Sequence, residues 1–304
     1  MTLHPFISAM LQKQKELGQK ALSAGTPEDA RLQIAAARSA LGRKQTITDI
    51  RELEIPTRSG SIPARLFLPA GDVTSLVIYL HGGGWMIGAL DDFDTLAREV
   101  AYRSKSAVLL PDYRLAPEHP FPAGLQDCED TLAWAVDTVA LIGQELPLVV
   151  AGDSAGANLA TIVARKVSRR IPLALQILIY PVTDCDLETA SYRTESDGMP
   201  ITRTDMQWFF HHYAPISQHA DPDISPLRAV DLGGMPPALI MTCEHDVLRD
   251  EGEAYAEKLR QAGNLVELHR YNGAPHGFIR LHNLYETADQ AIDDIAAAIS
   301  RHVR

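Results

Sequence analysis

The sequence predicts an α/β fold in which helices flank a mostly parallel central sheet. Four segments are apolar almost throughout, as strands are when helices cover both faces of a sheet. They are residues 75–82, 106–113, 146–153 and 173–181. Segments with the apolar periodicity of helices alternate with them, at 92–103, 122–141 and 155–168. This alternation is typical of βαβ units, and hence of a parallel sheet.

The flanking segments extend this sheet in both directions. Towards the C-terminus, strands are predicted at 237–244 and 265–272, with a helix at 250–261 between them and an amphipathic helix at 285–302. Towards the N-terminus, "IRELEIPT" and "IPARLFLP" alternate apolar and polar residues around a Ser59-Gly60 turn. That pattern predicts an antiparallel hairpin at the edge of the sheet.

Two regions interrupt the alternation of predicted strands and helices and divide the chain. Residues 1–49 are helical in pattern, and residues 184–221 form a long insertion that contains the aromatic helical stretch "MQWFFHHY". An insertion of this length in a compact α/β domain is usually functional. We therefore expect a core formed by 50–183 and 222–304, covered on its active face by a helical cap from 1–49 and 184–221.

Composition excludes several classes of function. The net charge of −11 is spread along 304 residues without a block of like charge, which disfavours a nucleic-acid partner or an anionic membrane surface. The three cysteines are far apart, and no Cys/His spacing suggests a metal site or a disulfide framework. The N-terminus lacks the apolar region of a signal peptide, and no apolar stretch is long enough for a membrane span. A cytoplasmic location is the expectation.

The first chemical motif is a G-x-S-x-G at residues 152–156, within "VVAGDSAGANLA". It stands between a predicted buried strand and a predicted helix, where a strained turn lifts a serine above the sheet. Only small residues at the flanking positions allow the backbone to cross so tightly. Ser154 is therefore a candidate nucleophile; the alternative is a glycine-rich turn that happens to contain a serine.

A serine nucleophile needs a base and an orienting acid. His276 stands in "YNGAPHGF", directly after the last predicted strand, whereas His269 falls inside that strand. Asp246 follows the preceding strand; Asp250 and Glu251 fit better as the acidic first turn of the next helix. The chain order serine, aspartate, histidine is that of the α/β hydrolases.

The third requirement is a set of donors for the oxyanion. "HGGGW" at 81–85 follows the strand "LVIYL", and its glycines can direct several backbone N–H groups at one point. A phosphate-binding loop would need a following Gly-Lys-Ser/Thr, which is absent. Ala155 would supply a further N–H at the start of its helix. Asp112, Arg114 and Glu118 are expected to form a charged network that holds this loop in place.

Several motifs together resemble one family. "HGGGW", "DYRLAPEHPFPA", "GDSAGANLA", "DPDISPL", "HDVLRDEG" and "HGF" stand in the order found in the hormone-sensitive lipase family of bacterial carboxylesterases, in its GDSAG subfamily. The resemblance implies an α/β-hydrolase core, a helical cap, no cofactor or metal, and hydrolysis of short- to medium-chain carboxylic esters. It assigns the triad to Ser154, Asp246 and His276 and the oxyanion amides to Gly83, Gly84 and Ala155. It also suggests a homodimer formed through the strand near residues 265–271.

The substrate pocket and the reaction are less constrained by the sequence. Aromatic and sulfur-containing residues near the motifs could line an acyl or alcohol pocket for a small ester, although at helical spacing they could equally be packed core. These candidates are Trp85, Met86, Trp208, Phe209 and Tyr213. Two alternatives stay open: an amidase or formamidase that uses the same triad, and a non-catalytic small-ligand receptor, against which the presence of His276 argues.

Overall fold

The computed structural model describes residues 2–42 and 44–303, and its centre is an eight-stranded sheet. The strand order is β1-β2-β4-β3-β5-β6-β7-β8. The strands are β1 (Asp49–Thr57), β2 (Gly60–Leu68), β3 (Leu76–Leu80), β4 (Ala107–Pro111), β5 (Leu148–Asp153), β6 (Leu173–Ile179), β7 (Ala238–His245) and β8 (Val266–Pro275). From β4 to β8 all neighbours pair in parallel, which confirms the predicted α/β-hydrolase fold.

The two edges of the sheet differ. The hairpin of β1 and β2 is antiparallel and pairs with β4, also antiparallel, so it forms the edge that its alternating sequence predicts. The strand β8 forms the opposite edge. Between these edges β3, β4 and β5 are buried along their whole length, as their continuous apolar sequences require.

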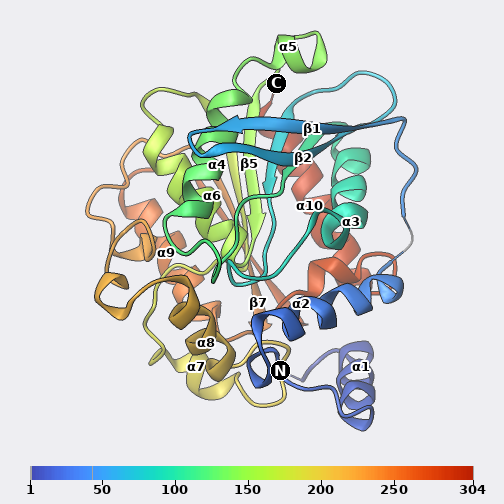
Figure 1. The fold of residues 1–304 in the computed structure, drawn as a ribbon, viewed down its shortest axis with the longest axis vertical. Helices are drawn as coiled ribbons and strands as arrows, with labels where there is room; N and C mark the ends of the chain where they lie inside the picture. The colour runs from blue at the N-terminus through green and yellow to red at the C-terminus, as the bar shows by residue number, and fades with distance from the viewer. Residues whose placement is uncertain (1, 43, 304) are drawn as a thin grey trace.

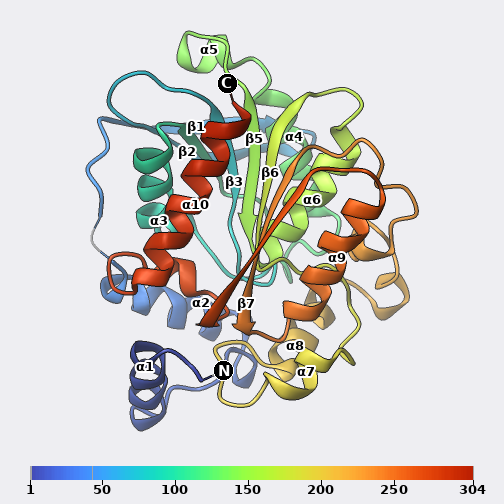
Figure 2. The ribbon, with the colours of Figure 1, turned by 180° about the vertical axis from the view of Figure 1, so that it is seen from behind.

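Helices cover both faces of the sheet (Figures 1 and 2). One face packs against α3 (Leu90–Ser104) and α10 (Glu286–His302), and the other against α4 (Ala123–Trp134), α6 (Ala155–Val167) and α9 (Arg249–Gln261). Successive strand residues point to opposite faces, so Ile78 joins one apolar cluster and Val77 and Tyr79 join the other.

The prediction of one continuous helix at 122–141 is wrong. The structure breaks it into α4 and a short α5 (Thr138–Ile142). The Asp137 side chain accepts a hydrogen bond from Ala140 N at 3.0 Å and so caps a new helix start. An aspartate inside an otherwise helical pattern is the signal that the periodicity alone did not weigh.

The segments before β1 and after β6 lie where the parallel strands end. Figure 1 shows α1, α2, α7 and α8 near the tip of β7. The segment before β1 contains α1 (Pro5–Glu16), η1 (Leu22–Ala24), α2 (Pro27–Ala36) and η2 (Ala37–Ala40). The segment after β6 contains α7 (Ala190–Thr194), α8 (Arg203–Tyr213), η3 (Ile216–Gln218) and η4 (Pro226–Arg228). A last short helix, η5 (Phe278–Leu281), follows β8. The two groups touch, because Ser23 donates to Asp205 Oδ1 through both N and Oγ, at 3.0 and 2.6 Å.

Within residues 2–42 and 44–303, no helix combines the length and the apolar character that a bilayer crossing requires.

Candidate active site

Ser154 stands on a sharp turn between β5 and α6. Its backbone has φ 55° and ψ −121°, a conformation that a residue with a Cβ rarely adopts and that costs about 1–3 kcal/mol. The turn is held because Ser154 N donates to Ile179 O at 2.8 Å. The side chain is 8% exposed, so the turn presents the hydroxyl at the end of the sheet without leaving it in bulk water.

The glycines of the motif allow this turn to pack. A Cβ on Gly156 would lie 2.0 Å from Leu80 O, and one on Gly152 would lie 2.5 Å from the Gly156 carbonyl group. Because these neighbours are backbone atoms, they cannot move aside as a flexible side chain would. The small residues therefore answer a steric need, as the sequence pattern predicts.

Loops from two other strands bring a histidine and an aspartate to Ser154. His276 follows β8, and its Nε2 lies 3.0 Å from Ser154 Oγ. Its Nδ1 lies 2.7 Å from Oδ2 of Asp246, which follows β7 and is 1% exposed. The other oxygen of Asp246 accepts from Leu248 N at 3.0 Å, which fixes the carboxylate. A carboxylate only accepts, so Nδ1 carries a proton and Nε2 is free to accept one from the serine hydroxyl.

The glycine loop lies beside the serine because β3 and β5 are parallel neighbours, with Leu80 paired to Gly152. Gly83 has φ 120° and Gly84 has φ 59°, both in the left-handed region that glycine favours. In the described part of the chain, the N–H groups of Gly83, Gly84 and Ala155 donate to no acceptor. They are thus available to a ligand oxygen near Ser154, which is what an oxyanion site requires.

A buried carboxylate and a buried histidine hold the base of this loop. Asp153 Oδ1 accepts from Gly82 N at 2.9 Å and from the Tyr79 hydroxyl at 3.0 Å. Burial raises the pKa of Asp153, and these two hydrogen bonds oppose that rise. His81 Nδ1 lies 2.8 Å from Gly82 O, and the Tyr113 hydroxyl donates to His81 O at 2.7 Å.

The charged network expected around this loop is partly different from the prediction. Glu118 does take part, but through Arg31, which sequence reasoning missed. Arg31 pairs with Glu118 and donates to Met86 O at 2.9 Å and to Ala116 O at 3.0 Å. Arg114 instead pairs with the fully buried Asp127 of α4, at 2.8 Å. Arg31 lies 55 residues before Met86, so no local pattern could have indicated the contact.

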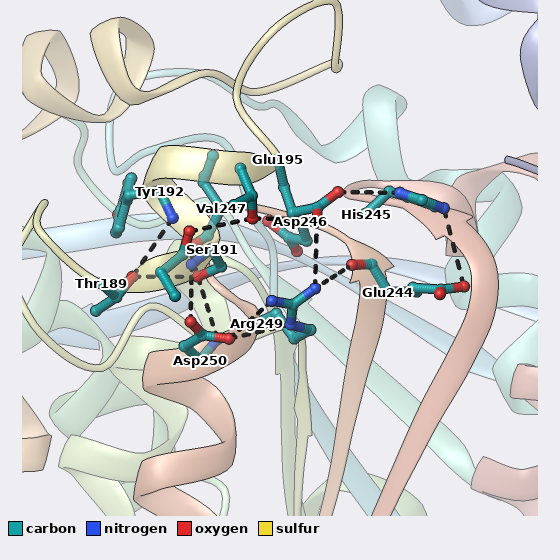
Figure 3. A network of polar contacts seen from close by, with 12 residues as sticks. Thr189, Ser191, Tyr192, Glu195, Glu244, His245, Asp246, Val247, Arg249 and Asp250 are labelled. Carbon is teal, nitrogen blue, oxygen red and sulfur yellow. Dashed lines mark hydrogen bonds and ion pairs between the residues drawn. The ribbon is translucent and has the colours of Figure 1, made fainter. Parts of the chain in front are cut away.

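A second polar network ties the loop that carries Asp246 to helix α7 of the insertion (Figure 3). Ser191 Oγ donates to Val247 O at 2.6 Å, and Ser191 N donates to Asp250 Oδ2 at 2.7 Å. Glu195 lies 3.0 Å from His245 Nδ1. The residues on both sides of Asp246 are therefore held by the insertion, which positions the acid from outside the sheet.

A cavity of about 230 Å³ opens above Ser154, His276 and the glycine loop, and most of its lining residues are apolar. Its outer walls come from the two segments that lie beyond the strand ends. These walls are formed by Met10, Gln14, Leu22 and Ile34 from the N-terminal segment and by Pro200, Ile201, Met206 and Phe209 from the insertion.

The predicted pocket residues do not match this lining. Of the five, only Phe209 borders the cavity. Trp85 is 2% exposed and stacks on Tyr213 with ring centroids 4.2 Å apart, Met86 is fully buried in the core, and Trp208 packs beside Phe209 at 5.3 Å. Trp85, Met86 and Tyr213 are buried in the core, and Trp208 is half-buried against it. The structure thus places Trp85, Met86, Trp208 and Tyr213 outside the lining of this cavity.

Within the described ranges, no three His, Cys, Asp or Glu side chains gather in a way that could hold a metal ion.

Comparison with known proteins gives the class of this fold and site. The family described as the alpha/beta hydrolase fold matches residues 77–280. The carboxylic ester hydrolase LipN of Mycobacterium tuberculosis is 37% identical, over 99% of this chain and 84% of that protein. The ethyl acetate hydrolase of Pseudomonas putida is 34% identical, over the whole of both chains.

Solved structures that resemble this chain are esterases as well. A thermostable esterase from Pseudomonas putida superposes with a TM-score of 0.94 at 32% identity, over 100% of this chain and 98% of that one. A hyperthermophilic esterase from Pyrobaculum calidifontis does so with a TM-score of 0.93 at 35% identity, over the whole of both chains. The chain belongs to the hormone-sensitive lipase family of bacterial carboxylesterases, within the α/β hydrolases.

Proposed function

We propose that this carboxylic ester hydrolase cleaves short- to medium-chain esters through a triad of Ser154, His276 and Asp246. The observation that carries the proposal is the continuous chain of two hydrogen bonds, 3.0 Å from serine to histidine and 2.7 Å from histidine to aspartate. Both distances are within the range at which proton transfer to a general base operates.

In the first half of the reaction, Ser154 Oγ attacks the ester carbonyl while His276 Nε2 takes its proton. Asp246 keeps the imidazole in the required tautomer and stabilises the cation that forms. The N–H groups of Gly83, Gly84 and Ala155 donate hydrogen bonds to the developing oxyanion, and one such donor is worth about 3 kcal/mol of barrier. His276 then protonates the alcohol as it leaves.

In the second half, water attacks the acyl-enzyme and His276 acts as base again. The carboxylic acid leaves and Ser154 recovers its proton. The cavity above the serine would hold the substrate's organic groups. Residues from both 1–49 and 184–221 line this cavity, which supports the proposal that these two segments form a cap.

The test compares the hydrolysis of p-nitrophenyl acetate, butyrate and octanoate by the wild type, Ser154→Ala and Ser106→Ala. Ser106 is a fully buried serine that hydrogen-bonds to Ser75 at 2.8 Å just before β4, so it controls for loss of a buried hydroxyl. We expect turnover by the wild type and Ser106→Ala, and a loss of at least about 10⁴-fold in kcat for Ser154→Ala. Equal rates in all three proteins would contradict the proposal.

A further inference from the structure

One charged side chain on the cavity wall is not used by the proposed reaction. Arg280 lies in η5, four residues after His276, and borders the same cavity as Ser154 and His276. Its guanidinium carbon stands 4.9 Å from the centroid of the Phe93 ring, and Nη2 donates to Asp92 O at 3.1 Å. The stacking and this one hydrogen bond fix the plane of the guanidinium.

Among the residues that the structure describes, no carboxylate lies within ion-pair distance of Arg280. Among the arginines of the described ranges only Arg170, Arg193 and Arg280 lack a carboxylate within ion-pair distance, and the first two are exposed to solvent. Of the nearby carboxylates, Asp92 pairs with Arg38 at 2.6 Å. The charge of Arg280 helps to lower the pKa of Asp153, but the two side chains form no ion pair, and Asp153 accepts its hydrogen bonds from Tyr79 and Gly82.

Three donors at this wall have no acceptor among the described residues. Arg280 Nε is buried and has no hydrogen-bond partner in residues 2–42 and 44–303, and Nη1 donates to none of these residues either. Tyr180 borders the same cavity, packs against the His276 ring at 4.5 Å, and has a buried hydroxyl without a partner. Arg280 as a whole is partly buried, and buried donors such as its Nε destabilise a fold unless something pairs with them. In a cavity with mostly apolar walls, a bound anion would do so.

We propose that the substrate is an ester carrying a second, ionised carboxylate, and that Arg280 binds this carboxylate. The inference rests on the proposed esterase function. A guanidinium matches a carboxylate in geometry and charge, and such charge-assisted hydrogen bonds are among the strong ones in proteins. The carboxylate could belong to the acyl part, as in a half-ester of a dicarboxylic acid, or to the alcohol part, as in an acylated hydroxy acid.

The experiment measures kcat/KM by proton release for matched pairs of charged and neutral esters. Monomethyl glutarate against methyl hexanoate tests a carboxylate on the acyl side. 3-(Butyryloxy)propanoate against its methyl ester tests one on the alcohol side. The proteins are the wild type, Arg280→Gln, Arg280→Lys and Arg270→Gln. Arg270 lies on β8 and pairs with Glu253 of α9, so Arg270→Gln controls for the loss of one positive charge.

The deciding quantity is the ratio of charged to neutral kcat/KM within one protein, which cancels any general change in activity. For one of the two pairs, we expect a ratio near or above one in the wild type and in Arg270→Gln. Arg280→Gln should lower this ratio about 10- to 100-fold, as loss of a charged hydrogen bond implies, and Arg280→Lys should restore part of it. The pair that responds identifies the side of the ester that carries the carboxylate.

A ratio that is the same in the wild type and Arg280→Gln for both pairs would overturn the proposal, while turnover of the neutral esters would leave the esterase function intact. Binding of monomethyl glutarate and of 3-(butyryloxy)propanoate to Ser154→Ala, with and without Arg280→Gln, gives a second readout by calorimetry. Binding that depends on Arg280 without turnover of any ester by the wild type would contradict the esterase and keep the carboxylate site. Equal binding of each ester to both proteins would count against Arg280.

Discussion

His81, at the start of the glycine loop, should make stability depend on pH in a way that one substitution can remove. Its side chain is fully buried, stacks on Tyr113 at 4.4 Å and on Phe93 at 5.0 Å, and lies with Nδ1 2.8 Å from Gly82 O. A carbonyl only accepts, so Nδ1 carries the proton of the neutral ring. A second proton would go to Nε2, which is buried and has no acceptor among the described residues.

The magnitude follows from the pKa of this histidine. Burial lowers the pKa of His81 from 6.5 to about 4. Because the folded pKa lies below the unfolded one, the unfolded chain binds more protons at acidic pH and the free energy of unfolding falls as pH falls. The loss begins near pH 6.5 and is nearly complete at pH 4. A shift from 6.5 to about 4 corresponds to about 3 kcal/mol, at roughly 1.4 kcal/mol for each pKa unit.

The assay is urea unfolding of the wild type, His81→Asn and Tyr113→Phe at several values between pH 7 and pH 4. Asparagine keeps a donor near the position of Nδ1 and does not titrate. It should be less stable than the wild type at pH 7, because removing the ring leaves a cavity that costs about 2 kcal/mol or more. Between pH 7 and pH 4 the wild type should lose about 3 kcal/mol relative to His81→Asn, enough to cancel or reverse a deficit of this size, since only the wild type must keep a buried imidazole neutral.

Tyr113→Phe is the matched control. It removes the hydroxyl that donates to His81 O but leaves the titrating ring in place. Its free energy of unfolding should therefore be lower than that of the wild type by a similar amount at every pH. A difference between His81→Asn and the wild type that stays constant from pH 7 to pH 4 would refute the reasoning.

Two further substitutions, Gly84→Ala and Arg31→Gln, test the glycine loop and a residue that supports it, and Gly143→Ala serves as a control for the first. Gly84→Ala would place a Cβ 2.1 Å from the Phe209 ring at φ 59°, so we expect kcat on p-nitrophenyl butyrate to fall by about 10²-fold or more as the oxyanion donors move. Gly143→Ala, at φ 87° with no atom within 4 Å, should lower stability but keep the wild-type kcat, and equal kcat in both variants would contradict this prediction. Arg31→Gln should lower the free energy of unfolding at pH 7 by about 1 kcal/mol, a modest value because the Glu118 side chain is 54% exposed. Arg31 lowers the pKa of Glu118 from 4.5 to about 2, so the ion pair stabilises the fold above pH 4.5 and is lost as pH falls towards 2. The deficit of Arg31→Gln in urea unfolding should therefore be smaller at pH 3 than at pH 7, and an unchanged deficit would argue against the ion pair.

The sequence indicated the features that depend on local steric demands. Gly152 and Gly156 could be recognised because the turn at Ser154 tolerates no Cβ at either position, whatever the rest of the chain does. The fold class followed from strands such as β3 and β5, whose continuous apolar sequences are consistent only with burial on both faces. Such requirements act within a few residues, so they leave a readable pattern.

Features that depend on distant contacts left no such pattern. Trp85 adjoins the glycine loop in the sequence, yet its ring stacks on Tyr213 beneath the loop instead of facing the cavity. Arg31 supports the loop from a segment that precedes the whole sheet. In both cases the local sequence is compatible with several orientations, and tertiary packing selects one of them.

The close approach of Gly84 and Phe209 links the size of the pocket to the reaction itself. Phe209 belongs to α8 of the insertion and borders the cavity, yet its ring fills the space that a side chain on Gly84 would occupy. Ser191 of helix α7 and Glu195, which directly follows this helix, bind the loop on both sides of Asp246. The insertion thus contacts the glycine loop and the acid loop at once. A substitution there that reshapes the cavity therefore changes the packing of groups that we assign to catalysis, so substrate preference and catalytic rate are coupled through the same helices.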